Sequence, residues 1–140
     1  MFSHAFISVS DFDKAFSFYS ALMRILGNEL KFVEPEKPWA GWHSAHGERP
    51  LFVICHPYDG GPQHPGNGQM LAFNANHRRQ VIDAYQTGLA KGGTCEGAPG
   101  LRPHYHPHYF AAYLRDPDGN KICVVCHAAE TEVQAIRTYI

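Results

Sequence analysis

The segment GLRPHYHPHYF, residues 100–110, places three histidines, His104, His106 and His108, at alternate positions. Imidazole is the commonest metal ligand in proteins and the side chain whose charge changes nearest neutral pH. Arg102, in the same segment, carries a planar guanidinium that is suited to binding carboxylate or phosphate. These residue types are typical of a metal site, of acid–base catalysis or of a pocket for a small anionic or oxygen-rich ligand.

The length and composition of the chain are those of a single globular domain. With 140 residues, 44% of them hydrophobic, the chain is predicted to form one compact unit. The net charge is −1 and no basic stripe or acidic run is present, so we expect neither nucleic acid nor a membrane surface as a partner. The N-terminus lacks the basic region of a signal peptide, and no apolar run approaches the ~20 residues that span a bilayer. We therefore expect a cytoplasmic protein whose four cysteines stay reduced.

Two of the cysteines, Cys123 and Cys126, form a C-x-x-C pair inside the run KICVVC. This run predicts a β-strand, and side chains three positions apart on a strand point to opposite faces of the sheet. A redox or two-cysteine zinc site is therefore not expected. Free cysteine is among the most buried residue types, so Cys123 is predicted to be a small core residue rather than a nucleophile.

The elements that must position these side chains form an internal repeat. Shifted by 66 residues, the apolar face of one predicted helix falls on that of a second, so that Tyr19 falls on Tyr85. Under the same offset Gly27, which ends the first helix, falls on Gly93, which ends the second. No gap is needed, so the chain is predicted to contain two copies of one structural unit.

Strand-like runs surround both helices in the same order. They lie at 6–10, 29–34, 39–44 and 51–56 in the first half, and at 70–73, 94–96, 109–115 and 121–126 in the second half. Ser10 or Asp11 is a candidate cap for the first helix and Asn76 for the second. Because one unit cannot bury both its helix and its sheet, we predict an α+β fold of two tandem β-α-β-β-β modules. Their predicted limits are 3–56 for module one, 57–68 for a linker rich in Gly and Pro, 69–127 for module two and 128–140 for a tail.

A chain of this length with two tandem modules resembles the vicinal oxygen chelate superfamily, which includes glyoxalase I, bleomycin resistance proteins and extradiol dioxygenases. The resemblance covers residues 3–127 and is carried by HAFISVSDFDKAFSFYSALM, LAFNANHRRQVIDAYQTGLAKGG and APGLRPHYHPHYFAAYLRDPDGNKICVVCH. The last segment is similar to a subgroup of small bacterial glyoxalase-like proteins. The resemblance implies that the mixed sheets of the two modules curl to form a cleft for a small molecule.

In that superfamily a divalent metal is held by residues on the first and last strand of each module. The resemblance places these positions at His4, at Leu51 or Phe52, at Met70 and at Cys123. Nickel and magnesium prefer imidazole, carboxylate and water as ligands, which a thioether and a hydrocarbon cannot replace. The resemblance therefore implies a zinc or nickel site with an incomplete ligand set of His4 and Cys123. It argues against an extradiol dioxygenase, whose iron needs two histidines and a glutamate.

Three interpretations of the histidine-rich segment are open at the level of the sequence. In the first, His104 or His106 joins His4 and Cys123 to rebuild a zinc site. In the second, polar side chains orient a small anionic or oxygen-rich ligand in the cleft: Arg102, His104, Tyr105 and His106. In the third, the same side chains only hydrogen-bond to the backbone of the loop or are solvated. The remaining loop histidines, His43, His46, His56 and His64, are predicted to be solvated.

Two functions from different classes follow. The first is a glyoxalase-like lyase or isomerase, in which His4 binds a metal and His104 or His106 acts as a ligand or general base. The second is a metal-free protein that binds or sequesters a small molecule, as resistance-type members do. Aromatic and apolar residues line the cleft in both hypotheses, with Trp39, Trp42, Phe52 and Met70 as candidates. A homodimer is expected because it is the commonest assembly of small proteins, and the amphipathic tail either caps the domain or packs on a partner subunit.

Overall fold

The computed structural model describes residues 1–139, and in that part of the chain it has two four-stranded sheets and three helices. Module one comprises β1 (His4–Ser8), α1 (Phe12–Ile25), β2 (Glu29–Glu34), β3 (Trp39–His43) and β4 (Leu51–Cys55). Module two comprises β5 (Leu71–Asn74), α2 (Arg78–Ala90), β6 (Thr94–Leu101), β7 (Phe110–Arg115) and β8 (Lys121–Cys126). A last helix, α3 (Glu132–Tyr139), follows. The predicted α+β fold of two tandem modules is confirmed.

The two sheets have the same topology, with strand orders β1-β4-β3-β2 and β5-β8-β7-β6. In each sheet the first strand of the module runs parallel to the last, and the other neighbours are antiparallel. β6 is longer than the predicted run at 94–96, and its pairing with β7 is interrupted by register shifts between Cys95 and Gly97 and between Gly97 and Gly100. Such bulges let one strand bend while its partner stays regular.

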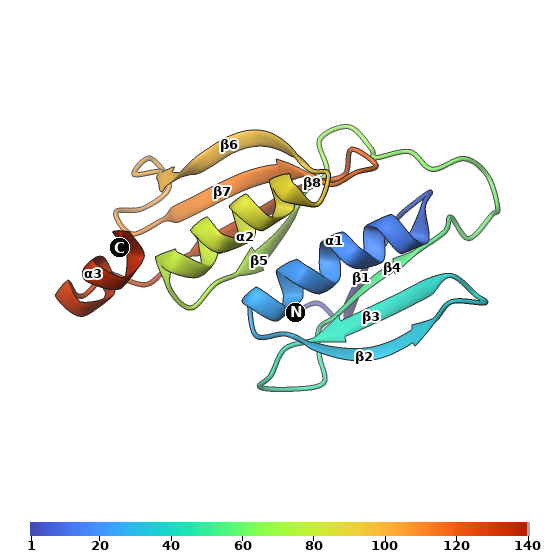
Figure 1. Cartoon of the computed structure of the whole chain (residues 1–140), viewed down its shortest axis with the longest axis horizontal. Coiled ribbons are helices and arrows are strands. Elements are labelled where there is room, and N and C mark those ends of the chain that lie inside the picture. The colour runs from blue at the N-terminus through green and yellow to red at the C-terminus, as the bar shows by residue number, and fades with distance from the viewer. Residues whose placement is uncertain (140) are drawn as a thin grey trace.

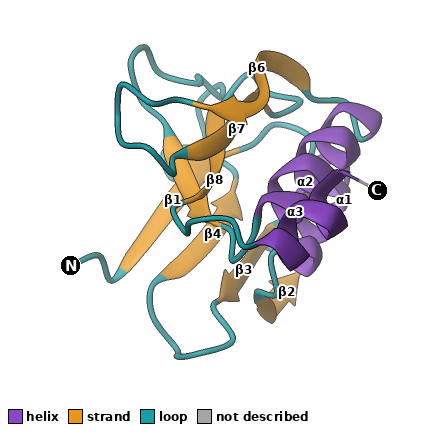
Figure 2. Ribbon diagram, turned by 90° about the vertical axis from the view of Figure 1, so that its left-hand side faces the viewer, coloured by secondary structure: helices purple, strands orange, loops and turns teal. Residues whose placement is uncertain are grey.

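All three helices lie on one side of the two sheets, and α1 and α2 run side by side across them (Figures 1 and 2). The main core fills the space between helices and sheets, with Tyr19, Ile54, Val81 and Val124 among its fully buried side chains. Strand side chains alternate, so every second one points away from the helices. The surface that these side chains form is called here the helix-free face of each sheet. The cysteine pair follows this alternation, because Cys126 belongs to the main core and Cys123 to a second cluster with Ala111.

The helix limits follow local capping chemistry. Asp11 is the N-cap of α1 and accepts a hydrogen bond from the Lys14 N–H at 3.1 Å. Gly27, just after the helix, has a φ of 77°, a conformation that glycine adopts without steric cost. α2 begins one residue later than predicted, since its N-cap is His77 and not Asn76. The Asn76 N–H instead donates to Oε1 of Gln80 at 2.7 Å, so a side chain inside the helix provides the acceptor for the backbone N–H group that precedes it.

The DPDGN turn between β7 and β8 joins the two modules. The buried carboxyl group of Asp116 accepts a hydrogen bond from the Tyr19 hydroxyl of α1 at 2.6 Å and one from Asn120 Nδ2 at 2.9 Å. Asn120 Nδ2 also donates to the Ser8 carbonyl at 2.9 Å, and Asp118 accepts from the Ser10 N–H at 3.1 Å. Burial raises the pKa of the Asp116 carboxyl group, while the hydrogen bonds from Tyr19 and Asn120 lower it. This motif therefore holds module two against β1 and α1.

The C-terminal tail caps the domain, as one of the two predicted alternatives has it. Arg78 of α2 forms an ion pair with Glu130 at 2.8 Å, and both side chains are largely buried. Arg79 Nη1 lies 3.4 Å from the Thr138 carbonyl of α3. In the described part of the chain, no helix is both long and apolar enough to cross a membrane. The four cysteines are unpaired.

Candidate functional site

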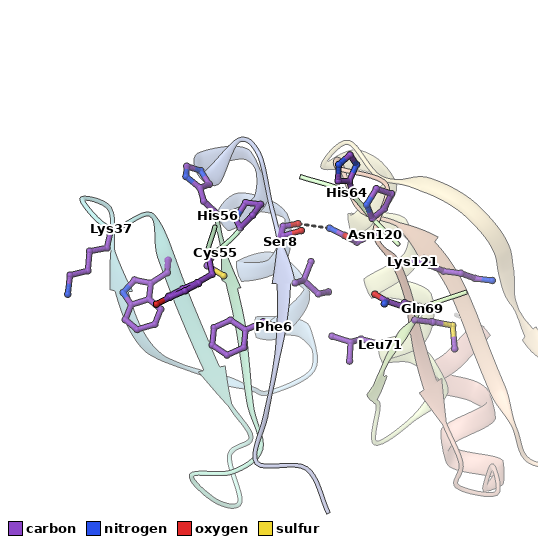
Figure 3. A pocket seen from close by; sticks show the side chains of 16 residues that line it. Phe6, Ser8, Lys37, Cys55, His56, His64, Gln69, Leu71, Asn120 and Lys121 are labelled. Atoms are coloured by element: carbon purple, nitrogen blue, oxygen red, sulfur yellow. Dashed lines mark hydrogen bonds between the residues drawn. The ribbon is translucent and has the colours of Figure 1, made fainter. Parts of the chain in front are cut away.

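A cleft with a volume of about 1030 Å³ opens on the helix-free face of module one (Figure 3). Its wall comes from β1, β3 and β4, from the linker after β4, and from residues just before β5 and at the start of β8. Its apolar side chains include Phe6, Trp39 and Leu71, and its polar ones include His56 and His64. A few polar groups around an apolar wall are the usual composition of a small-molecule site.

Local alternation explains why β1 contributes to both the core and the cleft. Ile7 and Val9 are buried in the core, so Phe6 and Ser8 point to the helix-free face. The Phe6 side chain is 53% exposed, although phenylalanine gains free energy from burial. Met70, which also lines the cleft, is 43% exposed. Large apolar side chains gathered in a hollow surface indicate a place where another molecule binds.

A smaller cavity of about 580 Å³ lies where the two modules meet, and four predicted site residues line it: His4, Trp42, Phe52 and Met70. Trp42 and Phe52 are nevertheless core residues, with ring centroids 5.8 Å apart and almost no exposed surface. His4 is exposed, and its Nδ1 lies 3.0 Å from the Ser3 hydroxyl oxygen. The structure thus brings His4 and Met70 to the wall of one cavity, while Trp42 and Phe52 pack in the core beneath that wall.

The other predicted site residues lie on module two, where the helix-free face is filled. The hydroxyl oxygens of Tyr109 and Tyr113 are 3.1 Å apart, and the Tyr109 oxygen lies 3.9 Å from Cys123 Sγ. Burial raises the pKa of both phenols and of the Cys123 thiol. All three groups are therefore protonated near neutral pH. Cys123 is fully buried, as predicted.

The histidine-rich loop is tied to the end of β8 by a pair of imidazoles. His106 Nε2 lies 2.8 Å from His127 Nδ1, and the His108 N–H donates to His106 Nδ1 at 3.1 Å. Because Nδ1 of His106 accepts the hydrogen bond from the His108 N–H, the ring hydrogen is on Nε2, which donates to Nδ1 of His127. His106 thus holds the loop, in keeping with the third interpretation. His104 is exposed, with its ring centroid 4.3 Å from that of Tyr105.

The residues present do not fit the metal site that the superfamily uses. Phe52 points into the core, and the residue of β4 that corresponds to Cys123 is Val53, since Phe6 is paired with Val53 as Ala72 is with Cys123. Valine offers no ligand atom, and neither does the hydrocarbon of Leu51. Among the side chains that the structure describes, no three from His, Cys, Asp or Glu lie close enough together to hold a metal ion. His4 and Cys123 therefore lack the third protein ligand that zinc needs.

The sequence model of the Glyoxalase/Bleomycin resistance protein/Dioxygenase superfamily matches residues 1–124. The chain belongs to this superfamily. A glyoxalase/bleomycin resistance protein from Albidiferax ferrireducens is 38% identical, with 90% of this chain and 98% of that one covered and a TM-score of 0.80. Among curated proteins none matches.

Two further solved structures show how widely this glyoxalase-type fold is shared. A superfamily member from Sphaerobacter thermophilus is 25% identical, with 90% of this chain and 96% of that one covered and a TM-score of 0.58. A lactoylglutathione lyase from Agrobacterium tumefaciens is 20% identical, with 90% and 92% covered and a TM-score of 0.59. At that identity the lyase supports the fold alone.

Sequence reasoning missed most of the residues that line the cleft. His56 and His64 are exposed loop residues, as predicted, but their place in the cleft wall was not foreseen. Phe6 carried a usable signal, because alternation along the first strand places it on the same face as His4. The linker histidines carried none, since their position depends on how the linker crosses between the modules.

Proposed function

We propose that this superfamily member binds a small molecule with an apolar body and oxygen-bearing polar groups in the cleft of module one. The observation that carries the proposal is the exposure of Phe6 and Met70 inside a hollow that also receives His56 and His64. Binding there would remove the apolar surface from water, which stabilises a complex by roughly 25 cal/mol for each Å² buried. The protein would act by binding or sequestration.

The polar groups around the cleft favour a ligand with hydrogen-bond acceptors. Lys37 and Gln69 line the wall together with the two linker histidines. Asn120 is also present, but its Nδ2 already donates to Ser8 and Asp116, as the dashed line to Ser8 in Figure 3 shows. The available donors therefore include Lys37, Lys121, Gln69 and the imidazoles. Such groups orient carbonyl, hydroxyl or carboxylate oxygens while the aromatic wall holds the ligand body.

A lyase or isomerase of the glyoxalase type is the second candidate, and His4 is the observation that favours it. His4 is exposed at the junction of the modules, where the smaller cavity lies. The positions that would complete the ligand set, Met70, Val53 and Cys123, do not offer the imidazole and carboxylate groups that nickel prefers. The binding function therefore fits the residues better than metal-dependent catalysis does.

Two measurements on tag-free protein test the choice. In the first, anilinonaphthalene sulfonate, a fluorescent probe with an apolar body and an anionic oxygen group, is titrated into the wild type, Phe6→Ser and Leu30→Ser. Leu30 is 47% exposed on β2, outside the cleft lining, and serves as the matched control. We expect about tenfold weaker binding for Phe6→Ser, from the loss of buried apolar area, and no change for Leu30→Ser. Equal binding by both variants would contradict the proposal.

In the second measurement, zinc and nickel are quantified by elemental mass spectrometry in the wild type and in His4→Ala after incubation with excess metal and dialysis. The binding function predicts no stoichiometric metal in either protein. Near-stoichiometric metal in the wild type that disappears with His4 would replace the binding proposal by the lyase.

A further inference from the structure

We propose that the helix-free face of module two holds a second site, which binds the carboxylate or phosphate group of a small anionic molecule through Arg102, Lys121 and Tyr113. The site shares Lys121 with the edge of the cleft, while Arg102 and Tyr113 lie outside the cleft wall. In Figure 3 the Lys121 side chain extends from the edge of the cleft away from Phe6. The proposal goes beyond the binding function argued above, because it concerns another face and another part of ligand chemistry.

The first support is the way in which β6 holds the Arg102 side chain. Arg102 directly follows β6, and its Nη2 donates to the Ala98 carbonyl of that strand at 2.8 Å. Gly97 and Gly100 make room for this folded-back conformation, because a Cβ atom there would lie 3.3 Å from Nη2 and 3.1 Å from Nη1, respectively. The two register shifts of β6 flank these glycines. The guanidinium is thus fixed by backbone groups, and most of its five N–H donors stay available for a ligand.

The second support is the charge that surrounds Tyr113. The Arg102 guanidinium carbon lies 5.6 Å from the centroid of the Tyr113 ring, and Lys121 Nζ lies 5.8 Å from the same centroid. Among the described residues, no carboxylate forms an ion pair with Arg102 or Lys121. Two cations near one ring repel each other, and a bound anion would replace that repulsion with attraction.

Arg115, on the same sheet, is a cation whose charge is neutralised by an ion pair. Arg115, on β7 like Tyr113, pairs with Glu96 and also donates to the Gly119 carbonyl at 2.8 Å. Glu96 is the acidic side chain of β6, and this pairing engages it. The pKa of the Glu96 carboxyl group is lowered chiefly by Arg115 and more weakly by Lys121, so the charge of Lys121 is offset in part, whereas Arg102 keeps its positive charge.

The third support is a hydroxyl donor in the same place. In the pair formed by Tyr109 and Tyr113, one phenol donates to the other, so one O–H proton remains. Its alternative partner is the Cys123 sulfur, 3.9 Å from the Tyr109 oxygen and a weak acceptor. The raised pKa values of both phenols keep them protonated. An anion at this face would therefore meet a guanidinium, an ammonium and a phenol, all of them donors.

The proposal is tested by isothermal titration calorimetry with inorganic phosphate and with acetate, which carry the anionic group without the apolar body that the cleft is proposed to bind. The proteins are the wild type, Arg102→Gln, Lys121→Gln and Lys91→Gln. Lys91 lies at the end of α2, with Nζ 3.2 Å from the Ser17 hydroxyl. Lys91→Gln therefore removes one positive charge from the opposite side of the molecule and serves as the control. We expect Arg102→Gln and Lys121→Gln each to weaken binding about tenfold, as for loss of one charge-assisted hydrogen bond, and Lys91→Gln to have no effect.

The outcomes separate this site from the cleft. Phe6→Ser should leave the binding of both anions unchanged, so a failure of the cleft proposal would not imitate a failure here. The tighter of the two ligands identifies phosphate or carboxylate as the preferred group. Unchanged affinity in Arg102→Gln and Lys121→Gln, or an equal loss in Lys91→Gln, would overturn the proposal. Should Arg102→Gln lower the thermal stability, Lys121→Gln decides together with Phe6→Ser, because Lys121 also borders the cleft: weaker binding in Lys121→Gln with unchanged binding in Phe6→Ser supports the second site.

Discussion

The helix-free faces of the two modules share one backbone plan, but their large side chains stand at different strand positions. Where module two has Tyr113, opposite Cys123, module one has Gly41, opposite Val53. Where module one has Trp39, opposite Cys55, module two has Ala111, opposite Val125.

The first strands differ in the same way, with Phe6 of β1 corresponding to Ala72 of β5. These exchanges leave module one with a cleft of about 1030 Å³ and module two with a face filled by phenols. One fold can therefore carry an open and a closed surface without any change of topology.

Gly41 shows how closely the wall of module one is packed. A Cβ atom at this position would lie 2.9 Å from Cζ of Phe32, so the ring of β2 occupies the place that a side chain of β3 would take. The Phe32 and Trp39 rings are 4.8 Å apart. The Phe32 ring thus covers Gly41 of β3, and the cleft is lined instead by Phe6, Trp39 and Cys55.

The largest expected effect comes from breaking the turn that holds the two faces in position. Asp116→Ala should lower the free energy of unfolding by about 3 kcal/mol, because it leaves the buried Tyr19 hydroxyl and Asn120 amide without their acceptor. Urea denaturation measures the change. Asp59→Ala, in the exposed linker, is the control and should unfold as the wild type does. Equal stability of the two variants would show that the turn does not couple the modules.

The filled face can be opened by removing its central ring. Tyr113→Ala should lower the free energy of unfolding by about 2 kcal/mol, less than for a fully buried ring because Tyr113 is only half-buried. The same variant should bind additional anilinonaphthalene sulfonate, since apolar surface of module two becomes accessible. Tyr105→Ala truncates an exposed ring of the histidine-rich loop and should change neither the free energy of unfolding nor the probe binding measurably. No added probe binding by Tyr113→Ala would mean that the histidine-rich loop fills the space left by the Tyr113 ring.

Thiol chemistry compares the two faces in one experiment. Cys55 lines the open cleft, whereas Cys123 lies beneath Tyr109 and Tyr113. Iodoacetamide should modify Cys55 about tenfold faster than Cys123, equivalent to ~1.4 kcal/mol of protection. Burial raises the pKa of both thiols, so less thiolate is present at neutral pH and both rates should rise at higher pH than that of free cysteine.

Peptide mapping by mass spectrometry between pH 7 and pH 9.5 follows each site, with exposed Cys95 as the internal reference. In Tyr113→Ala the ratio of the modification rates of Cys55 and Cys123 should become smaller. Modification of Cys123 as fast as Cys55 in the wild type would contradict the contrast between an open and a filled face.

The smallest effect is expected at the loop that borders the filled face. His106→Ala removes the hydrogen bonds to His127 and from the His108 N–H, which together should contribute about 0.5–1 kcal/mol. Amide hydrogen exchange over residues 103–108 should become faster, with the rest of β7 and β8 unchanged. His104→Ala, which alters an exposed ring of the same loop, is the matched control. Faster exchange in both variants would show that His106 has no special part in holding the loop.

Features that depend on residues close together in the sequence could be predicted, and features that depend on distant residues could not. The two modules follow from the 66-residue repeat, and the opposite faces of Cys123 and Cys126 follow from alternation within one strand; the structure confirms both. Of the two candidate caps, Ser10 and Asp11, the structure has Asp11. The register of the last strands was not visible in this way, so the position that Val53 occupies was assigned to Leu51 or Phe52. The helix start at His77 differs from the prediction by one residue, and the Asn76 N–H donates to the Gln80 side chain. The homodimer stays a prediction.

The sequence by itself determined the repeated α+β plan, since apolar periodicity and turn residues act over a few positions and need no knowledge of the partner element. Only the tertiary structure decided which face is open. That depends on the summed volumes of side chains from strands far apart in the chain, such as Phe32 against Gly41 and Tyr109 against Tyr113. It likewise decided that Asp116 meets Tyr19, and that Arg102 and Lys121 share one ring. Such encounters arise from how strands pair and modules pack, which local spacing does not encode.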